Sequence, residues 1–590
     1  MFLLSLCMKL NSVYANEVRC IDRERQALLK FKHGLVDDHG ILSSWGSEEV
    51  KKECCKWKGI SCSNRTGHVV SLDMHVPPSD GYVYLEAAKL IPALLELQNL
   101  NYLDLSFVDF GSEIPKFIGS FKKLRHLNLS GTFFIVSNFT GEVPCELGNL
   151  TNLHTLNLHE NNFRIKNLEW LSHLSLLSYL DLSDISYNEL NGPLTDVTKF
   201  SSLRFLILNN NKLNGFHPQS LGLPSSLESL ELFDNQFRRL PEGKISPTLG
   251  SLYKLEVLHL RNNNFIDELP STLRNGTRLR MLDVGGNKLT CNIPTWIGTH
   301  LTSLTVNSLR RNEFDGVMPS TICRLANIHV LDLSRNIISG RISRYLNNIT
   351  ALVQKNSSIE YGDWKFYHRY NPDYANNKGQ DSEYKTLGLL NGIDLSGNKL
   401  FGPIPQEFSA LRGLVFLNLS RNHLTGNIIS NIGQMEMLEC LDLSRNQLSG
   451  KIPNILVHRN FLGVLDLSYN NLTGKIPLGT QLQSFNSSMY AGNSQLCGKP
   501  LMECPKDISN SYVTDHGKGN IFEEDDRFII RDFYICMVFG FITGFWVVVI
   551  TLFLKHSWRH SYFNFWNNVS NWMYVTTTIY MIRFKRKFQT

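Results

Sequence analysis

Residues 438–453 read LECLDLSRNQLSGKIP, and this stretch decides the fold of the chain. It contains a phrase of leucine, two variable residues, leucine, one variable residue, leucine, two variable residues and asparagine, which ends at Asn446. The phrase returns through most of the sequence, and seven of its steps are 24 residues long. Its central leucine, or in one copy isoleucine, falls at Leu103, Leu127, Leu156, Leu180, Leu206, Leu230, Leu258, Leu282, Leu331, Ile393, Leu417, Leu441 and Leu465.

This period lies within the roughly 20 to 29 residues of leucine-rich repeats, in which each unit lays one short strand on a concave face. A single unit cannot bury its leucines, but a stack can, so such an array grows in one direction around one core. We therefore expect an α/β leucine-rich-repeat solenoid with short parallel strands on the concave face. Several separate globular domains, which 590 residues would ordinarily suggest, are not needed.

The asparagine that closes each phrase supports the same fold. Its amide carries donors and an acceptor that can satisfy backbone groups of adjacent coils, so a buried polar residue is tolerated there. The asparagines in this phase are Asn161, Asn211, Asn235, Asn263, Asn287, Asn312, Asn336, Asn398, Asn422, Asn446 and Asn470.

Six of the twelve cysteines flank the array and predict disulfide-bonded caps, which cover the exposed ends of a solenoid. We expect Cys20 with Cys54 and Cys55 with Cys62 before the array, and Cys497 with Cys504 after it. A zinc site is the alternative, but ligand pairs at metal spacing are absent from the sequence. Four further cysteines inside the array are expected to be lone buried thiols: Cys145, Cys291, Cys323 and Cys440.

Ten glycosylation sequons precede residue 500, and their density indicates a secreted ectodomain, in agreement with the cysteines. They are Asn64, Asn128, Asn138, Asn149, Asn275, Asn348, Asn356, Asn418, Asn471 and Asn486.

Residues 533–554 form a run of 22 residues without a charge, long enough for one transmembrane helix. Acidic residues precede the run and six basic residues follow it, so the positive-inside rule predicts a cytoplasmic tail at 555–590. Residues 1–15 resemble a short signal peptide. Together these segments predict a single-pass type I protein of the plasma membrane. Within the span, Gly540 and Gly544 form a small-residue step that favours contact with another helix.

The sequence gives no indication of catalysis. It contains no nucleophile elbow, zinc-protease helix, phosphate-binding loop or kinase signature, and its histidines are scattered. We therefore expect no enzyme, no cofactor and no metal. The six basic residues of the tail account for the whole formal charge of +6, so nucleic-acid binding is disfavoured and contact of the tail with anionic lipid is favoured.

Three motifs carry a family resemblance. The opening CIDRERQALLKFK from Cys20, the CCKWKGISC cap at 54–62 and phrases such as LSGKIP at 448–453 resemble plant extracellular leucine-rich-repeat proteins. Residues 540–544 and the WRHSYF stretch at 558–563 are similar to kinase-less receptor-like proteins of the ethylene-inducing-xylanase receptor type. The resemblance implies an extracellular protein, peptide or glycan ligand, and signalling through a membrane receptor kinase and a co-receptor.

An island interrupts the array between Leu331 and Ile393, which are 62 residues apart (393 − 331). Long insertions in regular arrays are usually functional or disordered, and this one is rich in aromatic residues. In the resembling family such islands help to recognise the ligand. We expect the same of four residues here: Tyr361, Trp364, Tyr367 and Tyr370.

A ligand-binding patch is predicted on the concave face of three neighbouring repeats. Outward positions there carry aromatic, aliphatic and charged residues, in contrast to the Asp, Asn and Ser of many other repeats. We expect these side chains to be exposed, although neutral variation of a solvated face explains the pattern equally well. The predicted residues are Phe205, Ile207, Asn209, Glu231, Phe233, His259 and Arg261, beside Ser229 and Val257.

Some features depart from a regular receptor. Asn307 occupies a core leucine position, Asp184 to Ser186 reads as an insertion, and the array is short for the resembling family. The alternatives to a defence receptor are therefore a developmental peptide receptor, a degenerate receptor copy, and a binding protein similar to the polygalacturonase inhibitors. The predicted membrane helix argues against the last, because such inhibitors are secreted.

The expected organisation follows from these assignments. It comprises a signal peptide (1–15), an N-terminal cap with the first repeat (16–98), repeats (99–351), the island (352–388), further repeats (389–480), a C-terminal cap with an acidic juxtamembrane segment (481–532), the transmembrane helix (533–554) and the cytoplasmic tail (555–590).

Overall fold

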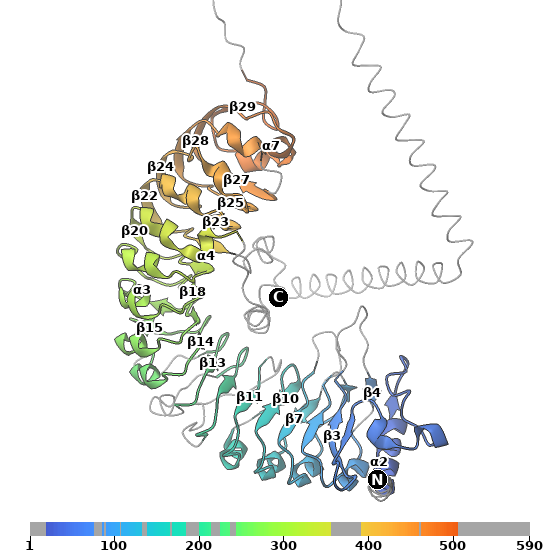
Figure 1. Cartoon of the computed structure of the whole chain (residues 1–590). Coiled ribbons are helices and arrows are strands. Elements are labelled where there is room, and N and C mark those ends of the chain that lie inside the picture. Colours follow the sequence, from blue (N-terminus) through green and yellow to red (C-terminus); the bar gives the residue numbers. More distant parts are fainter. Residues whose placement is uncertain are drawn as a thin grey trace, which may run out of the picture. The chain divides into compact units, whose positions relative to one another are not determined.

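The computed structural model describes residues 19–75, 85–87, 90–106, 108–131, 139–165, 168–183, 200–213, 225–236, 244–355, 391–458 and 462–504. These residues belong to one compact unit, which spans 1–505. Figure 1 shows the repeats of this unit as successive coils, each with a strand on the inner side.

A sixteen-stranded sheet forms the concave face. Apart from the antiparallel first pair β2–β3, its strands pair in parallel. The strands are β2 (Ile60–Cys62), β3 (Val69–Asp73), β5 (Tyr102–Asp104), β7 (His126–Asn128), β9 (Thr155–Asn157), β11 (Tyr179–Asp181), β12 (Phe205–Ile207), β13 (Ser229–Glu231), β14 (Val257–His259), β16 (Met281–Asp283), β18 (Val306–Ser308), β19 (Val330–Asp332), β21 (Gly392–Asp394), β23 (Phe416–Asn418), β25 (Cys440–Asp442) and β27 (Val464–Asp466).

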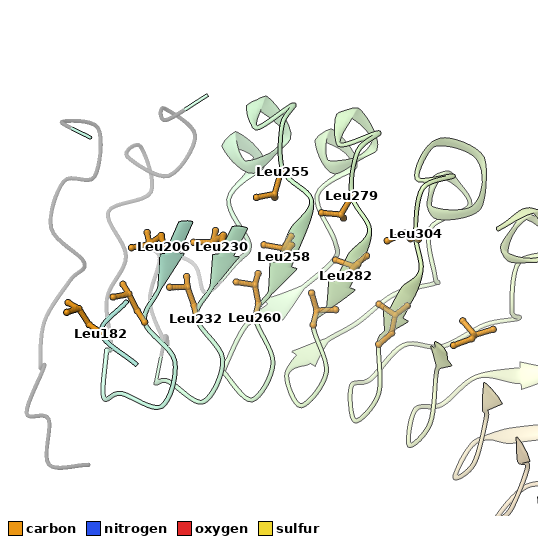
Figure 2. Close-up of a cluster of buried hydrophobic side chains, with 14 of the residues drawn as sticks. Leu182, Leu206, Leu230, Leu232, Leu255, Leu258, Leu260, Leu279, Leu282 and Leu304 are labelled. Carbon is orange, nitrogen blue, oxygen red and sulfur yellow. The ribbon is translucent and has the colours of Figure 1, made fainter. Parts of the chain in front are cut away.

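This sheet confirms the predicted repeat register. Each of the thirteen leucine or isoleucine positions inferred from the period is the middle residue of one strand, from Leu103 in β5 to Leu465 in β27. In Figure 2, Leu206, Leu230, Leu258 and Leu282 lie at equivalent places in successive coils. All four are at most 1% exposed, so the leucine rows form one continuous core.

Smaller sheets lie along the other sides of the coils. The largest has six strands: β20 (Ser339–Gly340), β22 (Lys399–Pro403), β24 (His423–Asn427), β26 (Gln447–Gly450), β28 (Asn471–Lys475) and β29 (Gln495–Cys497). The others contain β1 (Leu35–Val36), β4 (Leu85–Ala87) and β6 (Val108–Asp109); β8 (Thr140–Glu142) and β10 (Asn162–Arg164); and β15 (Ile266–Asp267) and β17 (Lys288–Leu289).

The convex side of the described coils is built mainly from single turns of 3-10 helix. The expected parallel strands are therefore present, but few of the expected α-helices are. The α-helices are α2 (Asp22–His33), α3 (Trp296–His300), α4 (Thr350–Val353) and α7 (Thr480–Ser484). The 3-10 turns are η1 (Glu49–Lys51), η2 (Cys54–Lys56), η3 (Pro92–Glu96), η4 (Lys116–Ser120), η5 (Cys145–Asn149), η6 (Glu169–His173), η8 (Pro247–Ser251), η9 (Ser271–Asn275), η10 (Ser320–Arg324), η11 (Arg344–Asn348), η14 (Gln406–Ala410), η15 (Ile432–Gln434), η16 (Asn454–His458) and η17 (Ser487–Tyr490).

The asparagine ladder behaves as the sequence predicts. Asn336 Nδ2 donates to the carbonyl oxygens of Leu309, Leu333 and Ser334 at 3.0 to 3.2 Å. Its Oδ1 accepts from the backbone N–H of Phe314 at 3.1 Å. Leu309 and Phe314 belong to the preceding coil, so each such amide joins two coils and is fully satisfied although buried.

The three predicted disulfides are present: Cys20–Cys54, Cys55–Cys62 and Cys497–Cys504. In the N-terminal cap, Glu24 on α2 is 3% exposed and accepts from the backbone N–H of Val69 on β3 at 2.7 Å, which ties the cap to the first strand of the array. Of the four cysteines inside the array, Cys323 and Cys440 are buried as expected. The expectation is wrong for Cys145 and Cys291, which are exposed because they lie outside the leucine rows.

Asn307 interrupts the leucine row, as the sequence indicates. It lies on β18 between Leu282 and Leu331 of the neighbouring strands and is 0% exposed. Neither its Oδ1 nor its Nδ2 has a hydrogen-bond partner in the described part of the chain. The insertion predicted at Asp184 to Ser186 lies outside the described residues.

Candidate ligand-recognition surface

The predicted patch lies on three consecutive strands, β12, β13 and β14, which pair in parallel and in register. Ile207, Glu231 and His259 therefore occupy one row across the sheet. Residues that flank the strand leucines point away from the core because side chains alternate along a strand. The structure thus brings the predicted residues together on the concave side.

Their predicted exposure is wrong for five of the seven residues. The exposed fractions are 3% for Ile207, 4% for Asn209, 0% for Glu231, 3% for Phe233 and 1% for His259. The other two, Phe205 and Arg261, are half-buried. Strands in a sheet lie only about 4.8 Å apart, so large side chains at equivalent positions cover one another.

Aromatic contacts show how this covering arises. The rings of Phe233 and His259 stack with their centroids 4.3 Å apart, and Tyr179 lies against Phe205 at 5.8 Å. The guanidinium of Arg204 lies 5.3 Å from the centre of the Phe205 ring. Phe205 is therefore held between neighbours yet keeps part of its surface accessible.

Glu231 is the centre of a buried polar network. It accepts from Ser229 Oγ at 2.8 Å and from Asn209 Nδ2 at 3.3 Å. Asn209 Oδ1 in turn accepts from the backbone N–H of Phe233 at 3.0 Å. A buried carboxylate is tolerated when such donors surround it, so these residues fix the shape of the patch from beneath.

His259 on β14 and Asp283 on β16 form a second buried polar pair beside Glu231. His259 Nε2 lies 3.3 Å from Asp283 Oδ2, and both side chains are buried. Burial alone raises the pKa of Asp283, but His259, the charge of Arg261 and the N–H of Gly285 outweigh it and lower that pKa to about 2. Asp283 is therefore a carboxylate at any physiological pH.

One apolar row on the outward side of the strands was missed. Val257, Met281, Val306 and Val330 form a buried cluster separate from the leucine core. They precede the central residue of β14, β16, β18 and β19. Four apolar residues at the same position of successive repeats are the sequence signal that could have found this row.

The island leaves the sheet without breaking it. Val330 and Leu331 of β19 pair directly with Gly392 and Ile393 of β21. The insertion therefore departs after α4 and returns just before β21. Residues 356–390 lie outside the described part of the chain, and with them Tyr361, Trp364, Tyr367 and Tyr370.

The predicted glycosylation sites fall into three groups. Asn128 and Asn418 lie on concave strands and are half-buried, and Asn128 Nδ2 donates to Asp104 Oδ2 at 2.9 Å. A glycan on Asn128 would have to displace this bond. Asn138 and Asn356 lie outside the described residues. The remaining six are exposed: Asn64, Asn149, Asn275, Asn348, Asn471 and Asn486.

Comparison with known families agrees with this architecture. The leucine rich repeat N-terminal domain matches residues 21–63. The Leucine Rich Repeat family matches residues 202–223, 254–275, 389–411, 413–435, 437–458 and 461–481. These matches agree with the repeat array and the N-terminal cap seen in the structure.

Similar proteins indicate which kind of leucine-rich-repeat protein this chain resembles. Receptor-like protein EIX1 of Solanum lycopersicum is 40% identical over 281 residues, which cover 42% of this chain and 27% of EIX1. Receptor-like protein EIX2 of the same plant is 29% identical over 1014 aligned positions, which cover 100% of this chain and 98% of EIX2. The resemblance to the kinase-less plant receptor-like proteins of the EIX type is confirmed. The EIX2 alignment exceeds the chain length by 424 positions (1014 − 590), so it is heavily gapped.

Solved structures support the fold. The ectodomain of the plant membrane receptor kinase GASSHO1/SCHENGEN3 from Arabidopsis thaliana, in complex with CASPARIAN STRIP INTEGRITY FACTOR 2, has a TM-score of 0.55 and 27% identity. The match covers 71% of this chain and 47% of that one. A TDR receptor has a TM-score of 0.54 and 24% identity over 70% of this chain and 66% of its own. The match spans about half of the GASSHO1/SCHENGEN3 chain and less than a third of EIX1. The partners of those complete proteins are therefore only proposals for this chain.

Membrane topology rests on the sequence alone. Among the described residues, no helix combines the length and apolar character that crossing a membrane requires. The predicted span 533–554, including Gly540 and Gly544, lies outside those residues, as does the signal peptide 1–15.

Proposed function

We propose that this chain is a single-pass plasma-membrane receptor-like protein that recognises an extracellular ligand of microbial origin in plant defence. The similarity to EIX1, 40% identical over 281 residues, carries the proposal. The ten sequons and three disulfides agree with an extracellular location of the repeats.

The concave patch and the island are the proposed ligand contacts. Phe205 and Arg261 retain accessible surface, and arginine and aromatic residues are typical of the residues that dominate binding energy at interfaces. Phe205 lies against Tyr179 and Arg204, which limits the movement of its ring. The island joins the array at β19 and β21, and its four aromatic residues are proposed to complete the contact.

Signalling is proposed to pass through a partner receptor kinase. The similarity to the receptor-like proteins EIX1 and EIX2 supports this proposal, in which a membrane partner supplies the phosphorylation signal. The Gly540 and Gly544 step would let another transmembrane helix approach closely.

The ligand test uses the full chain expressed in leaf cells that lack a response of their own. Secreted fractions from microbes are applied and the oxidative burst is measured. The double variant Phe205→Ala, Arg261→Ala should abolish the burst. The matched control Tyr253→Ala, Arg274→Ala removes an aromatic ring and an arginine that are both exposed outside the concave strands, and it should respond normally. Equal responses from both variants at equal surface abundance would reject the concave patch.

A second candidate function is perception of an endogenous developmental signal. It is favoured by the similarity to the GASSHO1/SCHENGEN3 ectodomain, which was solved with CASPARIAN STRIP INTEGRITY FACTOR 2. Fractions from the plant's own extracellular fluid, applied in the same assay, distinguish the two. A response to these fractions alone would replace the defence function with the developmental one.

The kinase test is affinity purification from plant membranes. Wild type should retain a receptor kinase that Gly540→Leu, Gly544→Leu weakens. A control with two substitutions in the same apolar segment, Ile542→Leu and Val548→Leu, should retain it fully. A kinase absent from all three preparations would indicate a degenerate copy or a binder that does not signal.

A further inference from the structure

The coils from β19 onward share a strongly basic surface on the side where the chain leaves each concave strand. Five equivalent segments form it, 335–341, 397–403, 421–427, 445–451 and 469–475, and they contain no Asp or Glu. We call their exposed lysines and arginines the basic face: Arg335, Arg341, Lys399, Arg421, Arg445, Lys451 and Lys475.

The six-stranded sheet holds these charges in rows. Phe401 pairs with His423, Thr425 with Gln447 and Ser449 with Asn471, all in parallel. Each pair joins the fifth residue of one segment to the third residue of the next, so equivalent residues of successive coils form oblique rows, displaced by two residues along the strands. Arg335, Arg421 and Arg445 form one row, and Arg341, Lys451 and Lys475 form a second row six residues further along each coil.

Glycines in the next coil accommodate the long side chains. Arg335 Cγ lies 3.3 Å from where a Cβ of Gly397 would be, and Arg341 Cγ is equally close to that of Gly402. Lys451 Cγ lies 3.4 Å from the corresponding point of Gly474. The aliphatic stems thus lie along the sheet while their charged ends reach solvent.

The first row occupies a repeat position that is left-handed throughout the array. Arg335, Arg421 and Arg445 have φ of +55°, and Arg311, Glu160 and Tyr469 have φ of +50° to +54° at the same position. This conformation therefore belongs to the repeat and does not distinguish the basic face, which is defined by its charge alone.

Hydroxyl groups lie between the two charged rows. Thr425, Ser449 and Thr473 are on the outward side of β24, β26 and β28, since they alternate with Leu424, Leu448 and Leu472 of the core. Phe401, at the same position on β22, is 48% exposed. Hydroxyls and one aromatic ring between rows of positive charge suit a polymer with both carboxylates and sugar rings.

The preceding coils are mixed in charge. The equivalent segment 262–268 contains Asp267 and Glu268, and 311–317 contains Glu313 and Asp315, whereas 286–292 between them has no acidic residue and carries Lys288. A run of five successive segments without an acidic residue is therefore confined to the last coils.

We propose that the basic face binds a linear polyuronate, an acidic polysaccharide with one carboxylate on each sugar. An extended polymer lying across the coils would meet a cation at intervals of one or two coils in the first row and of one or three coils in the second. Single-stranded nucleic acid is disfavoured, because it needs a series of aromatic residues for stacking. The five segments offer two, Phe401 and Tyr469, and the guanidinium of Arg445 already lies over the Tyr469 ring at 4.4 Å. The exposed sequons favour an extracellular polymer. This site lies beyond the proposed receptor function and does not depend on it, since none of its residues belongs to the concave patch or to the island.

The test measures binding of a fluorescent, fully de-esterified galacturonate oligomer to the full chain purified in detergent. The variant Arg335→Gln, Arg421→Gln, Arg445→Gln, Lys451→Gln should bind at least tenfold more weakly. A control with the same charge change outside the face, Lys122→Gln, Lys123→Gln, Arg274→Gln, Arg278→Gln, should change affinity less than twofold. Binding by wild type should also weaken steeply as salt rises, because exposed charges are screened.

Three results would overturn the proposal. Equal losses of affinity in both variants would mean that binding depends on the net charge of the protein and not on the basic face. Equal binding of the fully methyl-esterified oligomer would remove the role of the carboxylates. A polyglutamate of the same length that binds as tightly would identify the face as a site for an acidic protein segment. Unchanged thermal unfolding of the variants ensures that a loss of binding does not come from a loss of folding.

Discussion

Replacing Asn307 with leucine should stabilise the protein, although it removes a polar residue from the middle of a strand. The side chain is 0% exposed, and neither amide atom has a hydrogen-bond partner among the described residues. An unsatisfied buried amide costs about 1 to 3 kcal/mol, and burying a leucine side chain gains roughly 1.5 to 3 kcal/mol. Imperfect fit of the larger side chain takes back about 1 to 3 kcal/mol, which leaves a net gain of about 2 kcal/mol.

A matched substitution in the same coil, Asn312→Leu, should destabilise the protein. Asn312 Nδ2 donates to the carbonyl oxygens of Val284, Leu309 and Arg310 at 3.0 to 3.2 Å, and its Oδ1 accepts from the N–H of Leu289 at 3.0 Å. Asn312→Leu leaves these backbone groups without their partner, so it should destabilise the protein by at least about 2 kcal/mol.

Hydrogen exchange is the appropriate assay, because repeat arrays need not unfold in one step. Amides of β16, β18 and β19 should exchange about 30-fold more slowly in Asn307→Leu, which corresponds to about 2 kcal/mol. The same amides should exchange faster in Asn312→Leu. If Asn307→Leu left exchange unchanged or accelerated it, the amide must have a partner, such as a bound water, and the reasoning would fail.

Three further predictions concern the concave side and the cap. Burial raises the pKa of Asp394 from 3.8 to about 7, and the charge of Asp332 adds to this effect. The stability that the protonated Asp394 contributes is therefore greatest below pH 4 and is lost as the pH rises towards 7. Asp394→Asn should flatten this dependence in thermal unfolding between pH 4 and 8; a slope as steep as that of wild type would contradict the assignment. Phe233→Ala should cost about 3 kcal/mol in denaturant unfolding, because the ring is 3% exposed and stacks on His259; a cost under about 1 kcal/mol would mean that the ring is not packed as described. Changing both Cys497 and Cys504 to serine should cost about 2 kcal/mol, as expected for a loop of 7 residues, with exchange accelerated mainly near β29; uniform acceleration along the array would argue against a local cap.

The periodic part of the structure could be predicted from the sequence because one coil specifies the next. Leu103 and Leu465 lie far apart in the chain, yet each is the middle residue of its strand. The amide of Asn336 satisfies the coil before it, as its chemistry suggested. These features depend only on the position of a residue within its own repeat, which the period defines.

Exposure could not be predicted in the same way, because it depends on which side chains face each other across coils. Phe233 and His259 occupy different positions in their repeats, and only the three-dimensional arrangement shows that their rings stack. Glu231 reads as a surface charge in a single repeat, whereas Ser229 and Asn209 enclose it in the sheet. Cys145 and Cys291 were misassigned for a related reason, since membership of the array does not place a residue in the leucine rows.

The basic face is informative about function because its charges occupy outward positions, which the repeat itself does not fix. The asparagine ladder is the same in the coil around Asp315 and in those around Arg421, although Asn307 takes a leucine position in the former. The outward positions change from two acids in segment 311–317 to no acid in the next five equivalent segments. The loss of acidic residues beside Arg335, Arg421 and Arg445 is not required by this ladder and needs another cause. Binding of a polyanion is such a cause, and it predicts that glutamine at these three positions will weaken binding without reducing thermal stability.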